Sequence, residues 1–131
     1  MLVLDASVAL ELTLRSAKGA LASRMILHAG EELHAPHLID IEFAHAARRM
    51  VREKELDPIA AQEAFDDFLD LILKRHPHTT FLPRIWALRN ALSAYDAAYI
   101  ALAEALNAPL ATCDGRLSRS HGHHVDVRLI G

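Results

Sequence analysis

The stretch Leu2-Val3-Leu4-Asp5-Ala6-Ser7 decides the fold class, because three apolar residues are followed at once by an acid and small residues. A short apolar run that stops in this way is typical of a buried strand that leads directly into a helix. Leu110-Ala111-Thr112 repeats the pattern, and Cys113 and Asp114 follow it. We therefore expect two buried strands, each with an acid just beyond its carboxyl end.

The rest of the chain alternates short β-favouring runs with longer helical ones. Further strands are predicted at residues 33–35, 79–82 and 125–130. Helices are predicted at residues 19–29 and 38–55, from Asp57-Pro58 onward, and at 84–92 and 94–106. Strands that alternate with helices pair in parallel, and their sheet is covered on both faces. The sequence thus predicts an α/β fold with a central parallel sheet of four to five strands.

Length and composition limit the remaining possibilities. The chain has 131 residues, 52% of them hydrophobic, and 14 Lys and Arg against 17 Asp and Glu, for a formal charge of −3. This predicts a single domain over residues 1–131 whose surface does not hold nucleic acid by bulk positive charge. The single cysteine, Cys113, excludes an internal disulfide, and no apolar run has the length of a membrane span. We expect a cytoplasmic protein that does not contact a membrane.

Four acids lie in apolar surroundings. Asp5 and Asp114 follow the two buried strands, and the carboxyl ends of parallel strands meet at the edge where ligands bind. Asp96 belongs to an almost wholly apolar helical stretch at residues 94–103, and Glu42 lies between Ile41 and Phe43. Burying an unpaired carboxylate is costly, so four of them together require protons, cationic partners or a metal ion.

A divalent cation fits this set of acids best. Ligand sets made only of oxygen suit Mg²⁺ or Mn²⁺, whereas zinc usually recruits His or Cys. Such an ion beside a phosphodiester can activate a water molecule and stabilise the leaving oxygen. The sequence therefore predicts metal-assisted hydrolysis of a phosphate ester.

Each acid also has a purely structural interpretation. Asp5 or Ser7 could cap the helix after the first strand, and Asp114 could cap the turn at residues 115–117. Ser93-Ala94-Tyr95-Asp96 matches a capping box, so Asp96 could hold the start of its helix. Glu42 could pair with an arginine such as Arg89.

Other polar clusters have simpler explanations. The acids Glu63, Asp66, Asp67 and Asp70 are interpreted as the solvated face of a helix, and Asp40 as a solvated or first-turn acid. Residues 121–124, with three histidines, are interpreted as a surface loop, although a transition-metal site is the alternative. Arg48 and Arg49 lie at a basic helix end that could contact phosphates, and Arg89 is a further candidate for such a contact.

Leu4-Asp5-Ala6-Ser7, the inward Glu42, Tyr95-Asp96-Ala97 and Ala111-Thr112-Cys113-Asp114 together resemble the PIN domain family, above all its VapC-type ribonuclease toxins. The resemblance covers nearly the whole chain and depends on the order and spacing of these motifs. It implies a Mg²⁺- or Mn²⁺-dependent endoribonuclease of a type II toxin–antitoxin pair that cuts tRNA or ribosomal RNA. It also implies a homodimer and a cognate antitoxin whose C-terminal segment covers the active site.

By motif position, the resemblance makes Asp5, Glu42, Asp96 and Asp114 the catalytic acids. The first, third and fourth of these are the expected metal ligands, and Ser7 and Thr112 have supporting roles. Many PIN domains carry a further acid shortly after the fourth, but here Gly115-Arg116-Leu117 follows Asp114. We therefore expect one firmly held ion, with a second recruited by the RNA phosphate if at all.

Two other functions remain open. A haloacid dehalogenase-like phosphatase also has an Asp after its first strand, but that family needs a second Asp two residues later, where Ser7 stands here. An RNA-binding PIN domain without catalysis is the other alternative, and such domains commonly lose acids. Phosphate-binding and dinucleotide-binding glycine loops are absent from the sequence.

Overall fold

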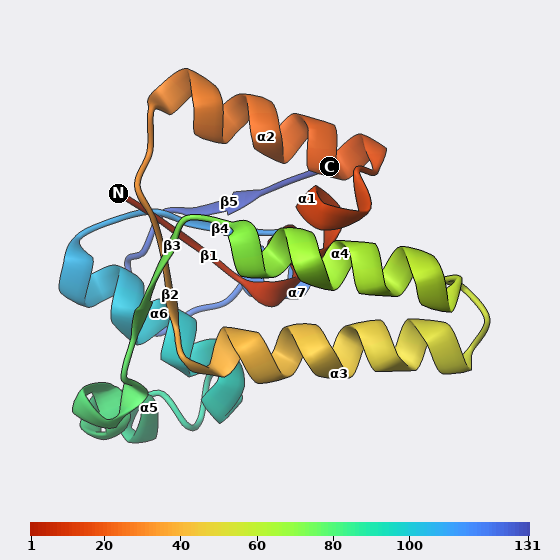
Figure 1. The fold of residues 1–131 in the computed structure, drawn as a ribbon. Coiled ribbons are helices and arrows are strands. Elements are labelled where there is room, and N and C mark those ends of the chain that lie inside the picture. Colours follow the sequence, from red (N-terminus) through yellow and green to blue (C-terminus); the bar gives the residue numbers. More distant parts are fainter.

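Five parallel strands form one sheet in the computed structural model, in the order β3-β2-β1-β4-β5 (Figure 1). The structure describes residues 1–131, apart from the side chains of residues 28 and 29. The strands are β1 (Leu2–Leu4), β2 (Leu33–Pro36), β3 (Leu73–His76), β4 (Leu110–Thr112) and β5 (Val127–Leu129). The predicted α/β class and parallel sheet are confirmed.

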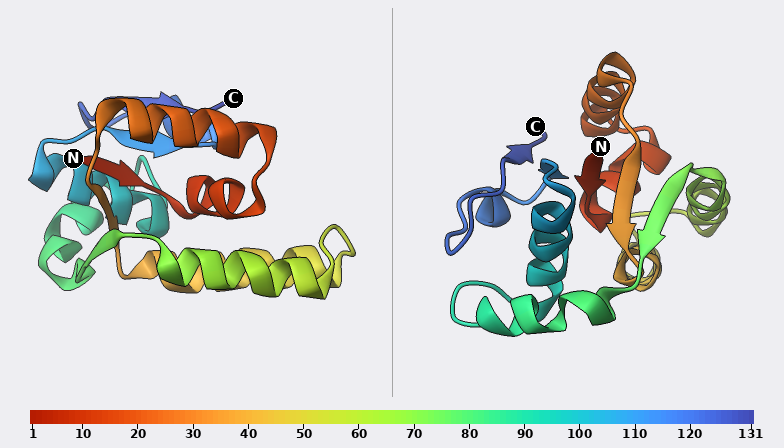
Figure 2. Two further views of the ribbon diagram at one scale, coloured as in Figure 1. Left: turned by 45° about the horizontal axis from the view of Figure 1, so that its top comes forward. Right: turned by 90° about the vertical axis from the view of Figure 1, so that its left-hand side faces the viewer.

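Helices cover both faces of this sheet, as Figure 2 shows. On one face, α1 packs on β4 and α3 packs on β2, while α6 packs on β1, β2 and β4 from the other face. Among the described helices, none is both long and apolar enough to cross a membrane. The helices are α1 (Ala6–Leu14), α2 (Ala17–Ala29), α3 (Leu38–Arg52), α4 (Pro58–Asp70), α5 (Leu82–Ala87), α6 (Ala94–Leu106) and α7 (Gly115–Ser118).

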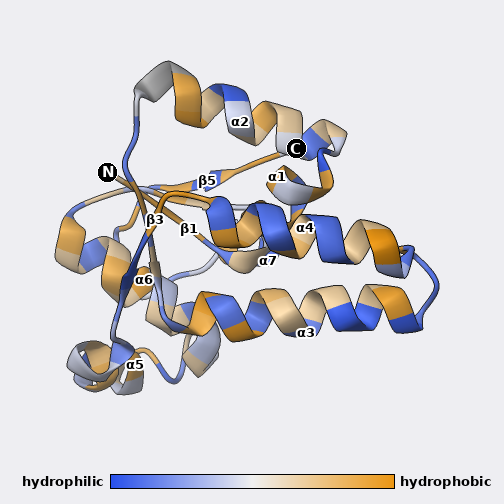
Figure 3. Ribbon diagram, in the orientation of Figure 1, coloured by the Kyte–Doolittle hydropathy of each residue, from blue (hydrophilic) through white to orange (hydrophobic). Residues whose placement is uncertain are grey.

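The centre of the sheet is the most deeply buried part of the fold. Every residue of β1 and β4 is buried, because each strand has neighbours on both sides and helices above and below. In α6, residues 97–103 are all buried, and Figure 3 shows this helix largely in apolar colours. A helix that is apolar on all sides is one enclosed by the core. Asp96, just before this run, is therefore held at the boundary of the core.

Helices α3 and α4 lie side by side and project beyond the sheet (Figure 1). In α4, Asp57 accepts the amide hydrogen of Ile59 at 3.3 Å and Pro58 occupies the first helical position, as the sequence predicts. Phe43 of α3 stacks on Phe68 of α4 with ring centroids 4.1 Å apart. Glu42 lies about 100° around α3 from Phe43, on a side of the helix that packs near α1.

One predicted strand is wrong. Residues 79–82 lie in a short 3₁₀ helix (His78–Phe81) and in the start of α5, whereas the third strand is β3. Pro77 ends β3 because it has no amide hydrogen for the ladder, and Pro83 favours the first turn of a helix. The sequence gives no apolar signal for β3, because an edge strand has few buried positions. Only Leu73 of its four residues is buried.

Other boundaries differ by a few residues. The first predicted helical stretch starts two residues earlier, at α2, where Ser16 accepts the amide hydrogen of Gly19 at 3.0 Å. The helix predicted at 84–92 is α5, which ends at Ala87, and turns follow it up to α6. Helix α3 ends at Arg52, and β5 is shorter than the predicted strand. Strands β1 and β4 and helix α6 have the predicted bounds.

Candidate active site

Asp5 lies at the carboxyl end of β1 and is almost fully buried, with 8% of its surface exposed. Its Oδ1 atom accepts a hydrogen bond from the Ser7 hydroxyl at 2.5 Å, and its Oδ2 atom accepts one from the Thr112 hydroxyl at 2.5 Å. Burial raises the pKa of the Asp5 carboxyl, while the bonds from Ser7 and Thr112 lower it. Both oxygens of this buried acid are thus held in fixed positions.

The same two hydroxyls tie Asp5 to the turn that follows β4. Ser7 Oγ accepts the amide hydrogen of Cys113 at 2.9 Å, and Thr112 Oγ1 accepts that of Asp114 at 3.0 Å. Each hydroxyl therefore donates to the Asp5 carboxylate and accepts from the backbone of the turn. This network fixes the backbone of Asp114 relative to Asp5.

Glu42 is half-buried on the face of α3 that looks toward the carboxyl ends of the strands. Its Oε1 atom accepts a hydrogen bond of 2.6 Å from the Tyr99 hydroxyl of α6. Burial raises the pKa of the Glu42 carboxyl, the Tyr99 bond lowers it, and the charges of Asp5 and Asp96 raise it further. The alternative pairing with Arg89 is not what the structure shows, because Arg89 donates to the carbonyl oxygen of Trp86 at 2.9 Å.

Asp96 lies in the first turn of α6, and Asp114 lies between β4 and α7. Burial raises the pKa of the Asp96 carboxyl, the charge of Asp114 raises it further, and Ser93 and Arg116 lower it. Arg116 is exposed and approaches Asp114 at 3.5 Å. The charges of Asp5 and Asp96 raise the pKa of Glu42, and the charge of Asp114 raises the pKa of Asp96. Acids from four parts of the chain thus act on one another's pKa values.

The capping interpretations hold in part. Asp5 accepts the amide hydrogen of Val8 at 3.2 Å, and Asp114 accepts that of Arg116 at 2.8 Å, so both acids also cap helices. Ser93 accepts the amide hydrogen of Asp96 at 3.1 Å. Among the described hydrogen bonds, the Ser93 amide donates none to the Asp96 carboxylate. The capping box is half formed, which leaves the Asp96 carboxylate available to a ligand.

The donor set suits a hard divalent cation, since it consists of carboxylate and hydroxyl oxygens. Among the described residues, however, no three His, Cys, Asp or Glu side chains stand close enough together to hold an ion as they lie. Asp96 and Asp114 are partly exposed, whereas the Asp5 carboxylate is held by the two hydroxyls. The oxygen chemistry of the site therefore fits a hard divalent cation.

A groove of about 880 Å³ runs beside Glu42 between α1, α3 and the start of α6. Ser7 and Glu42 line it, so it is continuous with the acidic site. Arg49 also lines this groove and pairs with Glu53 at 2.9 Å. The remaining lining residues are Ala6, Leu10, Glu11, Leu38, Ile41, His45, Ala46, Met50, Glu55 and Tyr95.

The three arginines proposed to contact RNA lie in different places. Arg48 lines a second groove between α3 and α4, on another side of α3 from Arg49. The Arg89 guanidinium lies over the ring of Trp86, 4.7 Å from its centroid. The structure thus shows no common phosphate-binding surface made by Arg48, Arg49 and Arg89. Contact of each with RNA stays a prediction.

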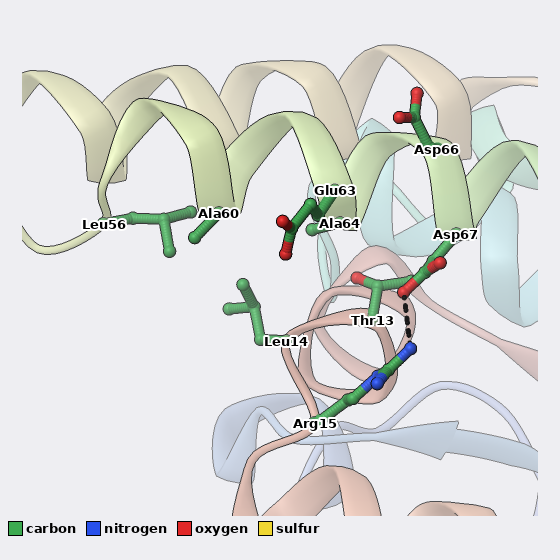
Figure 4. Close-up of a pocket in the computed structure, with 9 residues that line it drawn as sticks. All are labelled: Thr13, Leu14, Arg15, Leu56, Ala60, Glu63, Ala64, Asp66 and Asp67. Atoms are coloured by element: carbon green, nitrogen blue, oxygen red, sulfur yellow. Dashed lines mark hydrogen bonds and ion pairs between the residues drawn. The ribbon is translucent and has the colours of Figure 1, made fainter.

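The acidic run on α4 is separate from this site. Figure 4 shows a hollow of about 390 Å³ between α1 and α4, into which Glu63 points and beside which Arg15 pairs with Asp67 at 3.4 Å. Glu63, Asp66 and Asp70 are exposed. The interpretation of this run as a solvated helix face is confirmed. Asp40 lies in the first turn of α3, where Arg75 of β3 donates to both of its oxygens.

Sequence reasoning missed two groups. Tyr99 was hidden among apolar neighbours, although it follows Asp96 by three residues and so lies one helical turn further along α6. His34 of β2 is buried, and its Nδ1 and Nε2 atoms lie 2.8 Å from His76 Nε2 and from Glu32 Oε1. The contact between His34 and His76 could not be predicted, because His76 belongs to strand β3, which the sequence does not indicate.

Comparisons with known proteins agree with this architecture. A PIN domain family model matches residues 2–121. The chain is 41% identical over 130 residues to the protein named Ribonuclease VapC12 from Mycobacterium tuberculosis, with 99% of each chain covered.

Two solved structures share the fold. PAE2754 from Pyrobaculum aerophilum has a TM-score of 0.69 at 25% identity and covers 95% of this chain and 82% of its own. VapBC2 from Rickettsia felis, whose structure holds a fragment of promoter DNA, has a TM-score of 0.67 at 13% identity. The match covers 96% of this chain and 97% of the other. Sequence and fold lead to one conclusion: the chain belongs to the PIN domain family, in its VapC-type branch.

Proposed function

We propose that this protein is an endoribonuclease, the toxin of a type II toxin–antitoxin pair, which hydrolyses phosphodiester bonds in structured RNA such as tRNA or ribosomal RNA. The observation that carries the proposal is the buried Asp5 at the carboxyl end of β1, held by two hydroxyls, with Glu42 and Asp96 close enough that the charges of neighbouring acids raise their pKa values. The full-length similarity to a protein named a ribonuclease supports the same activity.

Asp5, Asp96 and Asp114 would hold one Mg²⁺ or Mn²⁺ ion. When bound, such an ion stabilises charge on the phosphate and lowers the pKa of a nearby water molecule. Ser7 and Thr112 keep the Asp5 oxygens oriented, so that this acid presents a fixed edge to its ligand. Asp96 and Asp114, which are partly exposed, would supply the remaining carboxylate oxygens.

Glu42 is suited to take the proton of the attacking water. Burial raises the pKa of its carboxyl, which moves it toward the range in which a general base works at neutral pH. Tyr99 holds one of its oxygens, and Glu42 lines the groove. In the reaction, the water oxygen forms a bond to phosphorus, the bond from phosphorus to the leaving oxygen breaks, and that oxygen ends protonated.

The test is cleavage of purified tRNA and ribosomal RNA by the wild-type protein with Mg²⁺ or Mn²⁺, with a chelator, and by Asp5→Asn and Asp96→Asn. We expect cleavage only by the wild-type protein with the ion. Asp66→Asn and Asp70→Asn, exposed acids of α4, are matched controls that should cleave normally. Undiminished cleavage by folded Asp5→Asn would refute the site, and RNA binding without cleavage by the wild-type protein would favour a purely binding domain.

A cognate antitoxin is the proposed protein partner. The groove beside the acids combines apolar side chains, among them Leu10, Ile41 and Met50, with the carboxylates of Glu11 and Glu42. Such a surface suits an amphipathic segment that carries a basic side chain, because a cation can offset the charge of the acidic site. Co-expression with the product of an adjacent short reading frame should yield a stable complex that no longer cleaves RNA.

A homodimer is also proposed. Leu82 and Trp86 are one helical turn apart in α5, and both are largely exposed, so they form a neighbouring pair of large apolar side chains on the surface. Burying them against a second copy would remove this apolar surface from water. Sedimentation should show a dimer for the wild-type protein and a monomer for Trp86→Glu.

A further inference from the structure

Tyr95 stands where the acidic site opens into the groove. It precedes Asp96 in the first turn of α6 and lines the groove together with Glu42 and Ser7. Its side chain is 61% exposed. An aromatic ring is therefore presented to solvent directly beside two of the proposed catalytic acids.

Most of the other aromatic residues pack on neighbours in the fold, including Phe81, which is partly buried against the core. Phe43, Phe65 and Phe68 pack on one another between α3 and α4. Tyr99 is buried and bonded to Glu42, and Trp86 is covered on one face by Arg89. Among the described residues, no ring or cation stacks on Tyr95. The ring thus offers free apolar faces at the mouth of the site.

The charges in the groove indicate which part of an RNA it suits. Its acids are Glu11, Glu42 and Glu55, against the single permanent cation Arg49, which is paired with Glu53. A surface of this charge repels a phosphate backbone along its length. Its apolar wall, with Leu38, Ile41 and others, suits the uncharged faces of a base. Aromatic side chains commonly bind unpaired bases by stacking.

We propose that Tyr95 and the apolar wall of this groove form a base-binding subsite, in which the ring stacks on one unpaired base next to the scissile phosphate. The inference rests on the proposed ribonuclease function and adds its substrate requirement. The nucleotide beside the cut must be unstacked, so a fully paired duplex is not a substrate. Specificity among RNAs then depends on which loops expose such a nucleotide at the right place.

The kinetic test compares Tyr95→Phe, Tyr95→Ala and Ile59→Ala on one RNA loop. Ile59 is an exposed apolar residue of α4 outside the groove and serves as the control. We expect Tyr95→Phe and Ile59→Ala to retain the wild-type KM. Tyr95→Ala should raise KM by about tenfold, as expected when a base loses its stacking partner, with little change in kcat. Alanine favours helix, so α6 should remain intact.

A second measurement reads stacking without cleavage. A loop oligonucleotide carrying 2-aminopurine at successive positions is titrated with the wild-type protein, Tyr95→Phe and Tyr95→Ala in a chelator. Quenching at one position by the first two proteins, and its loss with Tyr95→Ala, would support the subsite even if no RNA is cleaved. Failure of the function and failure of the subsite are therefore distinguishable.

Three results would overturn the proposal. The first is wild-type KM and quenching for Tyr95→Ala. The second is a Tyr95→Ala protein that changes its oligomeric state, which would assign the ring to an interface between copies. The third is a Tyr95→Ala protein that binds RNA as the wild-type protein does but no longer binds the antitoxin, which would assign the ring to the antitoxin alone.

Discussion

The Thr112 hydroxyl donates a 2.5 Å hydrogen bond to Asp5 and accepts the amide hydrogen of Asp114 at 3.0 Å. One buried side chain thus joins two acids that are far apart in the sequence. Since Thr112 has no exposed surface, solvent cannot replace either bond. The spacing of the two acids therefore depends on this hydroxyl.

Replacing Thr112 with valine keeps the shape of the side chain and removes its hydroxyl. We expect Thr112→Val to lose about 1–3 kcal/mol of stability, because an oxygen of Asp5 and the amide of Asp114 lose their partner. RNA cleavage should fall at least about tenfold, since the relative placement of the acids loosens. Chemical denaturation and kcat/KM measure the two effects.

Thr112→Ser and Thr13→Val are the controls for this change. Serine keeps the hydroxyl, so its variant should cleave RNA nearly normally. Thr13 is another buried hydroxyl, which donates to carbonyl oxygens within α1. If Thr13→Val reduces cleavage as much as Thr112→Val, the effect comes from general destabilisation and the role of Thr112 is refuted.

Tyr99→Phe should change the pH dependence of the reaction. The Tyr99 bond lowers the pKa of Glu42, so its removal raises that pKa. If ionised Glu42 accepts the proton of water, the acidic limb of kcat/KM against pH must move to higher pH. An unmoved limb would show that another group titrates there.

Divalent cations should stabilise the wild-type protein. A ligand that binds only the folded state adds about 2.7 kcal/mol at a hundred times its Kd, so the Tm rises with Mn²⁺ or Mg²⁺. Asp5→Asn and Asp114→Asn should lose most of this rise. Asp66→Asn and Glu63→Gln, at the hollow shown in Figure 4, should keep it. An equal rise in all five proteins would place the ion elsewhere.

Asp96→Asn should raise the Tm at neutral pH in a chelator. Burial, followed by the charge of Asp114, raises the pKa of Asp96 in the folded state. An acid whose pKa is higher in the folded state contributes its full stabilisation at pH values below its pKa in the unfolded chain. This contribution to the free energy of unfolding is lost as the pH rises through its pKa in the folded protein. A neutral amide avoids this loss, so the variant should gain most above that range and least in acid. A destabilised variant at neutral pH would contradict the electrostatic account.

His76 should make the protein sensitive to mild acid. Burial lowers its pKa below the usual 6.5, and the charges of His34, Lys74 and His37 act in the same direction. A base with a lowered folded pKa contributes stability above its unfolded pKa, and this is lost as the pH falls through the folded value. The Tm should therefore drop below about pH 6.5, and His76→Gln should flatten the drop. The exposed control His121→Gln should leave it unchanged.

Much of the architecture can be predicted because its signals are local. Apolar runs that stop at polar residues predict strands β1 and β4, and the cap Asp57-Pro58 predicts the start of α4. Strand β3 gives no such signal. Its pairing with β2 supplies the backbone partners, so its side chains need not be apolar.

The sequence by itself determined the α/β class, the four acids and the two hydroxyls beside them, because alternating burial and the chemistry of carboxylates are properties of short stretches. The tertiary structure decided how these groups work together. It paired Glu42 with Tyr99, joined Asp5 to the turn before Asp114, sent Arg48 and Arg49 to different grooves, and placed Tyr95 at the mouth of the site. Such relationships arise when distant segments meet across a sheet edge, and no local pattern encodes them.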